Sequence, residues 1–285
     1  MALVYLNGAL CPAEQAVISP MDRGFLFGDG LYEVIPSYDG RTVGFGLHIE
    51  RLAEGLRTID IVGAPSLSQW QEICNSVLAS HSEPNLGLYL QVSRGVAAVR
   101  GHAFPAATAP TVFVYAFPIA AARPAVLDNR AAYRVVTEQD QRWRRCDVKT
   151  TSLLGNVLHY QHSRANDADE TLLFNERGEL TEASTANVFV LHGKRVSTAP
   201  LDQQLLPGIT RHILLDLLRR DLHLEVVEQA VNRAQLAAAD EVWITSSSRE
   251  VVPVVAIDGV AVGTGEVGPG WLHAFTLYSN DKFNY

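Results

Sequence analysis

The chain contains three lysines, and one of them, Lys149, stands where lysine chemistry is conceivable. Lys194 lies in HGKR, which is typical of an exposed turn, and Lys282 lies in the polar C-terminal stretch SNDKFNY. Lys149 is followed by TTSLLGNVL, which we expect to be buried. A nucleophilic lysine must be unprotonated and shielded from water. Taken alone, however, this segment is better explained by a surface lysine at the start of a helix.

Glu182 lies in ELTEASTANVF, which has the pattern of a strand. Alternation along a strand would place Glu182 and Ser184 on the same face as Leu180. A buried carboxylate needs a cationic partner, and the protonated ring nitrogen of a bound cofactor is one such partner. In isolation, a glutamate that faces solvent from a half-exposed strand is the simpler interpretation.

Two later segments have the residues of an anion-binding site. In LPGITRHILL, the residues Gly208, Ile209 and Thr210 open a predicted helix, where free N–H groups and the helix dipole favour an anion. In WITSSSREV, a predicted strand ends in the hydroxyl-rich run 245–248. Each is an ordinary cap or turn by itself. Together with a lysine and a glutamate, they satisfy the minimum needs of pyridoxal 5'-phosphate (PLP).

The loop SRGVAAVRGHAFP carries Arg94, Arg100 and His102 between two predicted strands. Arginine and histidine two residues apart can bind a carboxylate, with the guanidinium supplying a bidentate fork. A solvated loop without a ligand is the alternative, and the loop alone favours it.

These residues need a scaffold, and the hydrophobic pattern predicts a mixed α/β fold. Strands are expected at 2–6 and 42–45, and helices at 48–61 and 68–81, the second capped by Ser66 or Ser68. The small, proline-containing stretch 120–127 predicts a linker. It would separate a smaller N-terminal α/β domain, 1–119, from a larger domain, 128–285, that contains Lys149. Later strands are expected in YRVVTE, TLLFN and DEVWITSSS, and helices in LLGNVLHYQHSRAND and GITRHILLDLLRRD.

Composition excludes several classes of protein. The 285 residues are 47% hydrophobic with a formal net charge of −8, which suits a large core and argues against a general nucleic-acid role. No apolar run approaches the length of a membrane span, and the N-terminus lacks the features of a signal peptide. Three widely spaced cysteines favour neither disulfides nor zinc, and fit a reducing cytoplasm. No G-x-S-x-G is present, which disfavours a serine hydrolase.

As a set, the motifs resemble those of the class IV (fold type IV) PLP aminotransferases, and within them most closely the D-amino acid aminotransferases. Four segments carry the resemblance, and the hydroxyl-rich 246–250 agrees with them: DRGFLFGDGLYEV at 22–34, RWRRCDVKTTSLLGNVL at 142–158, ELTEASTANVF at 179–189 and LPGITR at 206–211. Their order and spacing are more specific than any one motif. The C-terminal stretch WLHAFTLYSNDKFNY departs from the family pattern.

The resemblance implies a role for each matching residue. Lys149 would form the Schiff base with PLP and move the proton during transamination, and Glu182 would pair with the pyridine nitrogen. Arg142 would support the cofactor pocket without touching the cofactor, and Tyr32 would lie near the substrate. The phosphate of PLP would be bound by Arg51, Ile209, Thr210, Ser246 and Ser247.

The resemblance also implies a substrate class and an assembly. Arg100-Gly101-His102-Ala103-Phe104-Pro105 fits the R-x-H-x-F-P loop that traps the substrate carboxylate in D-amino acid aminotransferases, where the loop reaches the neighbouring subunit. We therefore expect a homodimer that transfers the amino group of D-alanine or D-glutamate to a 2-oxo acid such as 2-oxoglutarate or pyruvate. An aminodeoxychorismate lyase, a branched-chain L-amino acid aminotransferase, an (R)-amine transaminase and an inactive binding module remain alternatives.

Overall fold

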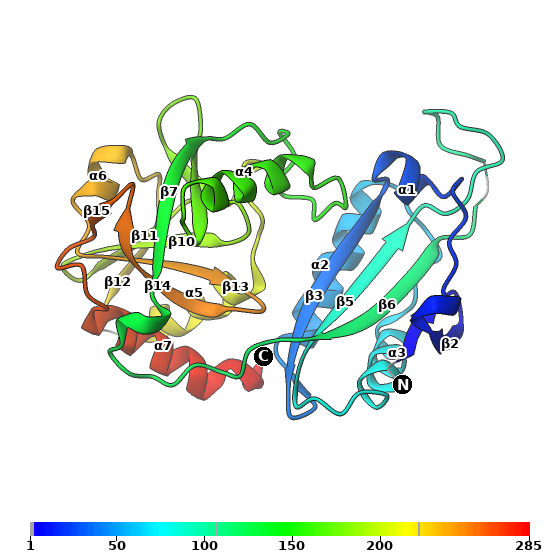
Figure 1. Cartoon of the computed structure of the whole chain (residues 1–285), viewed down its shortest axis with the longest axis horizontal. Helices are drawn as coiled ribbons and strands as arrows, with labels where there is room; N and C mark the ends of the chain where they lie inside the picture. The colour runs from blue at the N-terminus through cyan, green and yellow to red at the C-terminus, as the bar shows by residue number, and fades with distance from the viewer. Residues whose placement is uncertain (1–2, 107, 222) are drawn as a thin grey trace. The chain divides into compact units, whose positions relative to one another are not determined.

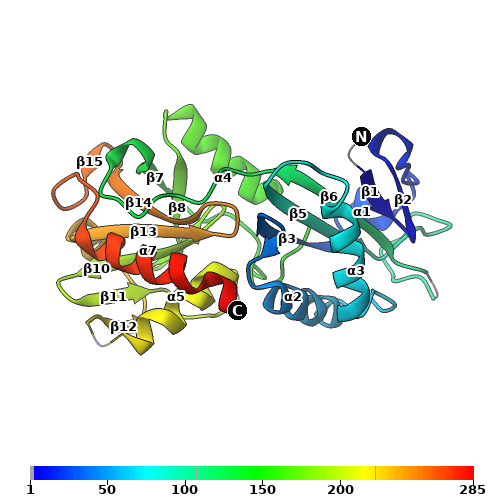
Figure 2. The ribbon, with the colours of Figure 1, turned by 90° about the horizontal axis from the view of Figure 1, so that it is seen from below.

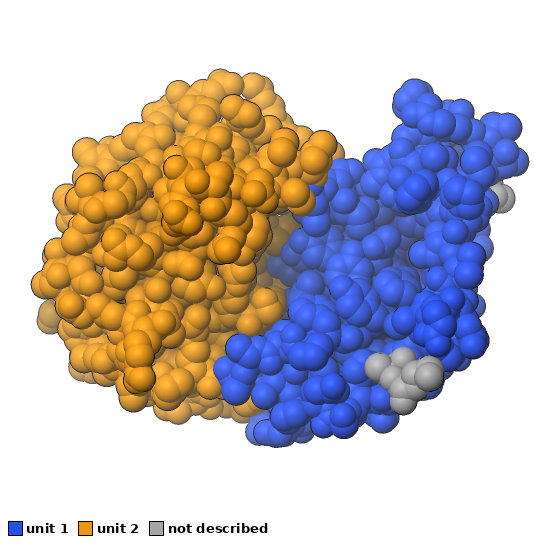
Figure 3. Space-filling model, in the orientation of Figure 1, with its two compact units in different colours: residues 1–121, 148–153, 285 blue, residues 122–147, 154–284 orange. Residues whose placement is uncertain are grey.

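The computed structural model describes residues 3–106, 108–221 and 223–285. The chain divides into two compact units, coloured separately in Figure 3. Unit 1 comprises residues 1–121, 148–153 and 285, and unit 2 comprises 122–147 and 154–284. The first passage between them falls at the start of the stretch that we expected to be a linker. The short segment 148–153, which includes Lys149, groups with unit 1.

Unit 1 is built on a six-stranded antiparallel sheet in the order β2-β1-β6-β5-β3-β4 (Figure 1). The predicted strand 2–6 is β1, with residue 2 outside the described residues. The strand bounds are β1 Leu3–Leu6, β2 Ala9–Pro12, β3 Gly30–Tyr38, β4 Arg41–Thr42, β5 Asn85–Ser93 and β6 Thr111–Pro118.

The helices of unit 1 follow local signals in the sequence. Helix α2 begins directly after Gly44, whose φ of 63° ends the extended backbone, so the prediction of a strand through residue 45 is wrong beyond Thr42. Helix α3 has a capping box between Ser66 and Gln69, which confirms Ser66 as its cap. The bounds are η1 Ala13–Gln15, α1 Arg23–Phe27, α2 Phe45–Thr58 and α3 Leu67–Leu78.

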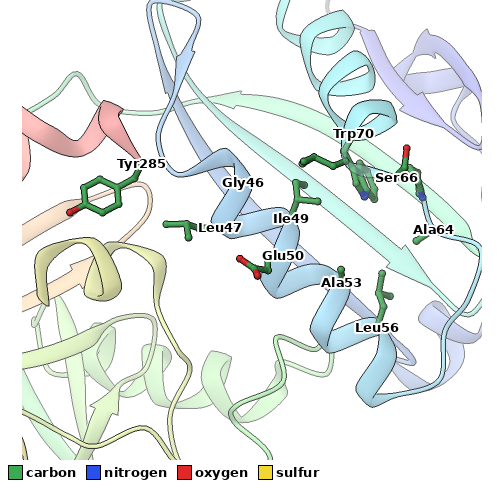
Figure 4. Close-up of a pocket in the computed structure, with 12 residues that line it drawn as sticks. Gly46, Leu47, Ile49, Glu50, Ala53, Leu56, Ala64, Ser66, Trp70 and Tyr285 are labelled. Carbon is green, nitrogen blue, oxygen red and sulfur yellow. The ribbon is translucent and has the colours of Figure 1, made fainter. Parts of the chain in front are cut away.

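Alternation along the strands gives the sheet of unit 1 two different faces. Leu88, Leu90 and Val92 of β5 belong to the hydrophobic core with the apolar residues of α2 and α3. Tyr89 and Gln91 point to the opposite face. Residues of α2, of the connection that follows it and of the start of α3 line a largely apolar pocket of about 640 Å³, shown in Figure 4.

Unit 2 contains a nine-stranded mixed sheet in the order β12-β11-β10-β13-β14-β7-β8-β9, with β15 paired to β14. The pairs β11–β12, β14–β7 and β7–β8 are parallel. The strand bounds are β7 Tyr133–Gln139, β8 Glu170–Phe174, β9 Leu180–Ala183, β10 Asn187–His192, β11 Arg195–Thr198, β12 Glu225–Glu228, β13 Glu241–Ser246, β14 Glu250–Ile257 and β15 Val260–Ala261.

Helices pack against this sheet, and Figure 2 shows α7 running beside α5. Within the described residues, no helix is long and apolar enough to cross a membrane. The bounds are η2 Asn129–Ala131, α4 Leu154–Ala165, α5 Ile209–Arg220, α6 Arg233–Ala237, α7 Pro269–Asp281 and η3 Lys282–Asn284.

One expectation about burial is wrong, and one burial was not predicted. The segment after Lys149 is not buried, because Leu154, Val157 and Leu158 of α4 are 72%, 57% and 62% exposed. Conversely, Lys282 in the polar tail is only 3% exposed and forms an ion pair with the equally buried Glu250 of β14. The polar residues of the tail do not indicate this pairing, since Glu250 lies 32 residues before Lys282 in the chain.

Candidate active site

Lys149 and Tyr32 lie together in unit 1. The backbone N–H of Tyr32 on β3 donates to the carbonyl of Lys149 (3.1 Å), and Leu31 and Thr150 form an isolated antiparallel bridge. The side chains also meet, since Lys149 Nζ is 4.2 Å from the centre of the Tyr32 ring. The short segment 148–153 is thus fixed along the edge of β3, and this places the lysine beside the tyrosine.

A buried charged cluster lies close by, on β3 and α2. Arg51 binds the carboxylate of Glu33 through two nitrogens, with Nε–Oε1 and Nη2–Oε2 distances of 2.7 and 2.8 Å. The ring of His48 contacts the same carboxylate at 2.7 Å. Burial opposes the charge of Glu33, but Arg51 and His48 outweigh it and hold the Glu33 pKa well below its usual range.

His48 itself is also shifted. Burial lowers the pKa of His48, and the positive charges of Arg51 and Lys149 act in the same direction, against the charge of Glu33. Lys149 therefore lies within electrostatic reach of this cluster. We predicted that Arg51 binds phosphate, and the structure shows that two of its nitrogens are also engaged with Glu33.

Tyr32 is part of an aromatic face on the sheet of unit 1. Its ring stacks on that of Tyr89 with centroids 5.5 Å apart, and Tyr89 donates a 2.7 Å hydrogen bond to the Gln91 side chain. A pocket of about 500 Å³ opens on this face and is lined by Tyr89, Gln91, Phe113 and Thr151, among others. The arrangement gives Tyr32 an apolar and hydroxyl-rich neighbourhood.

Arg100 and His102 are exposed on the long connection between β5 and β6. Both contact Phe27 of α1: the guanidinium carbon of Arg100 is 4.8 Å from the ring centre, and the His102 ring centroid is 5.6 Å away. The two side chains therefore contact one aromatic ring.

Glu182 lies in unit 2 and is almost fully buried, at 5% exposure. Its Oε1 accepts a short hydrogen bond from Arg142, which also pairs with Asp140 (2.7 Å). Its Oε2 accepts from the Asn187 side chain (3.0 Å) and from the backbone N–H of Leu206 (3.1 Å). Every carboxylate oxygen thus has a donor, as a buried carboxylate requires.

The electrostatics of this carboxylate suit a basic partner. Burial raises the pKa of Glu182, and the charge and hydrogen bond of Arg142 only partly oppose this. For Arg142, burial acts against the charged form, but the charges of Glu182 and Asp140 prevail and raise its pKa. A carboxyl group of raised pKa shares a proton readily with a ring nitrogen.

The N-terminus of α5 is close to Glu182 through Asn187. The Asn187 amide donates to the carbonyl of Leu206 (2.9 Å), just before the helix. Gly208 is the cap, with no hydrogen bond from a side chain, so the first helical N–H groups at Ile209 and Thr210 keep their capacity to bind an anion. A Cβ at Gly208 would lie 2.0 Å from Asn187 Oδ1, so the close approach requires glycine.

Strand β13 brings hydroxyl groups to the same neighbourhood. Thr245 is paired with Asn187 across the sheet, and its buried Oγ1 has no hydrogen-bond partner in the described part of the chain. An unpaired buried hydroxyl is unfavourable unless a ligand satisfies it. Ser246 ends β13, and Ser247 follows in the turn to β14. The orphaned hydroxyl, the uncapped helix and the basic carboxyl group together fit the phosphate and ring of PLP.

The structure thus gathers the predicted residues in two groups. Unit 1 holds Tyr32 beside Lys149, and in it Arg100 and His102 each contact Phe27. In unit 2, hydrogen bonds connect Glu182 to Arg142 and, through Asn187, to the start of α5. Ser246 directly follows Thr245, whose hydroxyl has no partner in the described residues. Sequence reasoning missed the Glu33–His48 pair and did not single out Asn187. The only available signal for Asn187 was an amide among the apolar residues of a predicted strand.

Comparison with known proteins identifies the class to which this site belongs. The model of the family "amino-transferase class IV" matches residues 30–257, and the chain belongs to this family. It is 35% identical over 270 residues to a D-alanine aminotransferase of Staphylococcus haemolyticus, covering 94% of each chain. A D-alanine aminotransferase of Bacillus licheniformis is 36% identical over 266 residues, 93% of this chain and 92% of its own. The chain is a PLP-dependent aminotransferase.

Solved structures support the fold. A branched-chain amino acid aminotransferase from Escherichia coli has a TM-score of 0.87 at 23% identity, covering 99% of this chain and 94% of its own. A branched-chain amino acid aminotransferase from T.th., solved with pyridoxamine 5'-phosphate, has a TM-score of 0.90 at 24% identity, with the same coverage. The mixed α/β, fold type IV architecture predicted from the sequence is confirmed.

Proposed function

We propose that this enzyme transfers the amino group of D-amino acids, such as D-alanine and D-glutamate, to a 2-oxo acid such as 2-oxoglutarate or pyruvate. One observation carries the proposal beyond the family: Arg100 and His102 lie exposed on one loop and share contact with Phe27. A guanidinium beside an imidazole is suited to an α-carboxylate. The similarity to D-alanine aminotransferases over nearly the whole chain supports the same substrate class.

PLP supplies a carbonyl group that takes up the substrate nitrogen and a ring that withdraws electrons from Cα. We assign its covalent attachment to Lys149, which then removes the proton from the substrate Cα. Tyr32, whose ring lies next to the Lys149 amine, would contact the substrate carboxylate together with Arg100 and His102. The lysine must lose its proton to do so.

The cofactor itself would be held mainly by unit 2. Glu182 would accept the hydrogen bond of the ring nitrogen, and Arg142 would orient Glu182 from the far side. The phosphate would be bound by Ile209, Thr210, Ser246, Ser247 and Arg51. The free N-terminus of α5 and the orphaned hydroxyl of Thr245 support this assignment.

We also propose that the enzyme is a homodimer, in which the Arg100–His102 loop of one protomer completes the active site of its partner. The outward position of this loop supports the idea, as does the apolar surface formed by Leu154, Val157 and Leu158 of α4. The three cysteines are free, which supports a reducing cytoplasm as the location.

An amine-donor panel tests the substrate class. The holoenzyme is mixed with D- or L-alanine and with D- or L-glutamate, and the absorbance of the bound cofactor is followed with and without 2-oxoglutarate. We expect a change with the D-isomers and formation of D-glutamate when D-alanine and 2-oxoglutarate are supplied. A response to L-isomers alone would replace the proposal with an L-amino acid aminotransferase, and pyruvate release from aminodeoxychorismate without an acceptor would replace it with a lyase.

Complementation tests the shared site. Lys149→Ala and Arg100→Ala protomers, each expected to be inactive or weak as a homodimer, are co-expressed with two different tags. If Arg100 acts on the partner's site, each mixed dimer has one intact site, so a random mixture should recover about one quarter of the wild-type activity. No recovery in purified mixed dimers would show that Lys149 and Arg100 act within one protomer.

A further inference from the structure

The five-residue helix α1 holds the loop that carries Arg100 and His102. Asp22 caps the helix by accepting a 2.8 Å hydrogen bond from the N–H of Gly24, and Gly28 ends it with a φ of 63°. Arg23 and Phe27 are four residues apart and therefore lie on one face of the helix. Both side chains contact the loop.

Arg23 binds the backbone of the loop directly. Its Nη1 donates to the carbonyl of Gly101 at 2.6 Å and, more weakly, to that of Ala103 at 3.4 Å, while its Nη2 donates to that of His102 at 3.3 Å. Arg23 is only 4% exposed. One buried, planar guanidinium thus contacts three successive peptide groups, which a lysine ammonium could not do with the same geometry.

Asp29 fixes Arg23 in turn. Asp29 Oδ2 accepts from Arg23 Nε (2.7 Å) and from Arg94 Nε (2.8 Å). Arg94 also donates to the carbonyls of Ile59 (2.6 Å) and Asp60 (2.8 Å), at the end of α2. Burial opposes the charge of Asp29, but the two arginines keep its pKa below the usual range, so the carboxylate stays ionised at neutral pH. The chain of contacts connects the loop to the core of unit 1.

The loop needs such an anchor because its own sequence offers little. The run Gly95–Val99 before Arg100 consists of glycine, alanine and valine, without a polar side chain. Beyond the loop, Phe104 packs under the guanidinium of Arg94, 3.5 Å from ring centre to Cζ. Arg23 therefore binds the backbone of residues 101–103, while the exposed side chains of Arg100 and His102 contact Phe27.

We infer that Arg23 is a positioning residue that sets the affinity of Arg100 and His102 for the substrate carboxylate. The inference rests on the proposed function of that pair. Arg23 does not touch substrate; it restricts the backbone from which both side chains project. Misplacement of binding groups by about 1 Å can cost up to about 100-fold in rate, so loss of this anchor should be felt in substrate binding.

Arg23→Met and Arg23→Lys test the inference, with Arg57→Met as the matched control. Arg57 lies on the exposed surface of α2 in the same unit and pairs with Glu54. In the Arg23 variants we expect the KM for D-alanine and for 2-oxoglutarate to rise about tenfold or more. The PLP dissociation constant should stay within about twofold, because no predicted PLP ligand touches Arg23. Amide hydrogen exchange should accelerate across residues 99–105.

A double-mutant cycle with Arg100→Ala separates positioning from loss of stability. If Arg23 acts through Arg100, adding Arg23→Met to Arg100→Ala should raise the KM by less than about threefold, whereas a general defect would be additive. If Arg23→Met fails to fold, Arg23→Lys and Phe27→Leu replace it in the cycle. Unchanged KM values despite faster exchange in the loop would overturn the inference.

The same measurements distinguish failure of the positioning role of Arg23 from failure of the proposed function. If Arg100→Ala leaves the KM of every α-amino acid unchanged, the carboxylate role of the loop is wrong, and the role of Arg23 falls with it. If Arg100→Ala raises the KM but the Arg23 variants do not, only the positioning role is overturned.

Discussion

The Asn187 amide donates a 3.0 Å hydrogen bond to the buried carboxylate of Glu182 and, with its second hydrogen, binds the carbonyl of Leu206. One side chain therefore links the group expected to face the ring nitrogen to the helix expected to bind the phosphate. Its strand partner is Thr245, the residue with the orphaned hydroxyl. Asn187 is the common neighbour of the three parts of the proposed cofactor site in unit 2.

Asn187→Ala should weaken PLP binding by about tenfold and lower the free energy of unfolding by about 1–3 kcal/mol, because the buried carboxylate of Glu182 loses one of its donors and the carbonyl of Leu206 loses the same amide. Titration of the apo-protein with PLP and denaturant unfolding measure the two effects. Asn166→Ala is the control, since Asn166 is exposed and its side chain donates to the nearby carbonyl of His162. Equal PLP affinity in the two variants would contradict the linking role.

Glu182→Gln should lower kcat on the order of 100-fold, since a neutral amide cannot stabilise positive charge on the ring nitrogen as a carboxylate does. Arg142 keeps Asp140 as an ionic partner, so we expect the variant to fold. Steady-state rates with D-alanine and 2-oxoglutarate give the result. Glu176→Gln, at an exposed position, serves as the control. A kcat within about threefold of the wild type would exclude the assigned role.

Local signals in the sequence were sufficient to predict most elements. Ser66 and Gln69 make the capping box of α3, and apolar spacing located α2 to within three residues. These two correct predictions share one property: the information is contained in a few neighbouring residues. The roles of Lys149 and Glu182 come from the family motifs and stay predictions.

What sequence reasoning missed depends on contacts between distant residues. The sequence shows Glu33 only as an acidic residue within a predicted strand. In the structure, His48 and Arg51 of α2 contact its carboxylate. Lys282 has the appearance of an exposed tail residue until Glu250 is known to lie beside it. The burial of a charged group is decided by its partner, and pairing at long range leaves no periodic pattern.

His48 predicts a dependence of stability on pH. Its folded-state pKa is lowered by burial and by nearby positive charge, so the unfolded chain, with a pKa of about 6.5, takes up the proton first. More protons are then bound in the unfolded state, and stability falls as the pH falls below about 6.5, by up to about 1.4 kcal/mol per pH unit. Glu33 acts only at lower pH, because its depressed pKa matters below about 4.3.

Denaturant unfolding at intervals between pH 7.5 and 5 measures this effect. His48→Gln should be less stable than the wild type at pH 7.5, and the difference should narrow towards pH 5. Replacement of the exposed His223 by glutamine is the control and should leave the slope unchanged. A constant difference between His48→Gln and the wild type across this range would show that His48 does not resist protonation.

The buried ion pair between Lys282 and Glu250 predicts a large loss of stability when one partner is replaced. Lys282 and Glu250 are each 3% exposed, and a second oxygen of Glu250 has no hydrogen-bond partner in the described residues. Removal of one member of a buried pair leaves an uncompensated charge and typically costs about 3–5 kcal/mol. We therefore expect Lys282→Met to lower the free energy of unfolding by that amount, whereas Lys194→Met, in an exposed turn, should change it by less than about 0.5 kcal/mol.

The same substitution should weaken cofactor binding, because Glu250 closes the turn that carries Ser246 and Ser247. Glu250 has a φ of 61°, a conformation that non-glycine residues rarely adopt, and Ser246 is its partner across the turn. Without Lys282, the carboxylate of Glu250 loses the ion pair that holds this backbone in place.

The double variant Lys282→Met/Glu250→Gln removes both charges and should recover at least about 1 kcal/mol of the free energy of unfolding over Lys282→Met alone. Additive losses in the double variant would show that the two residues act independently.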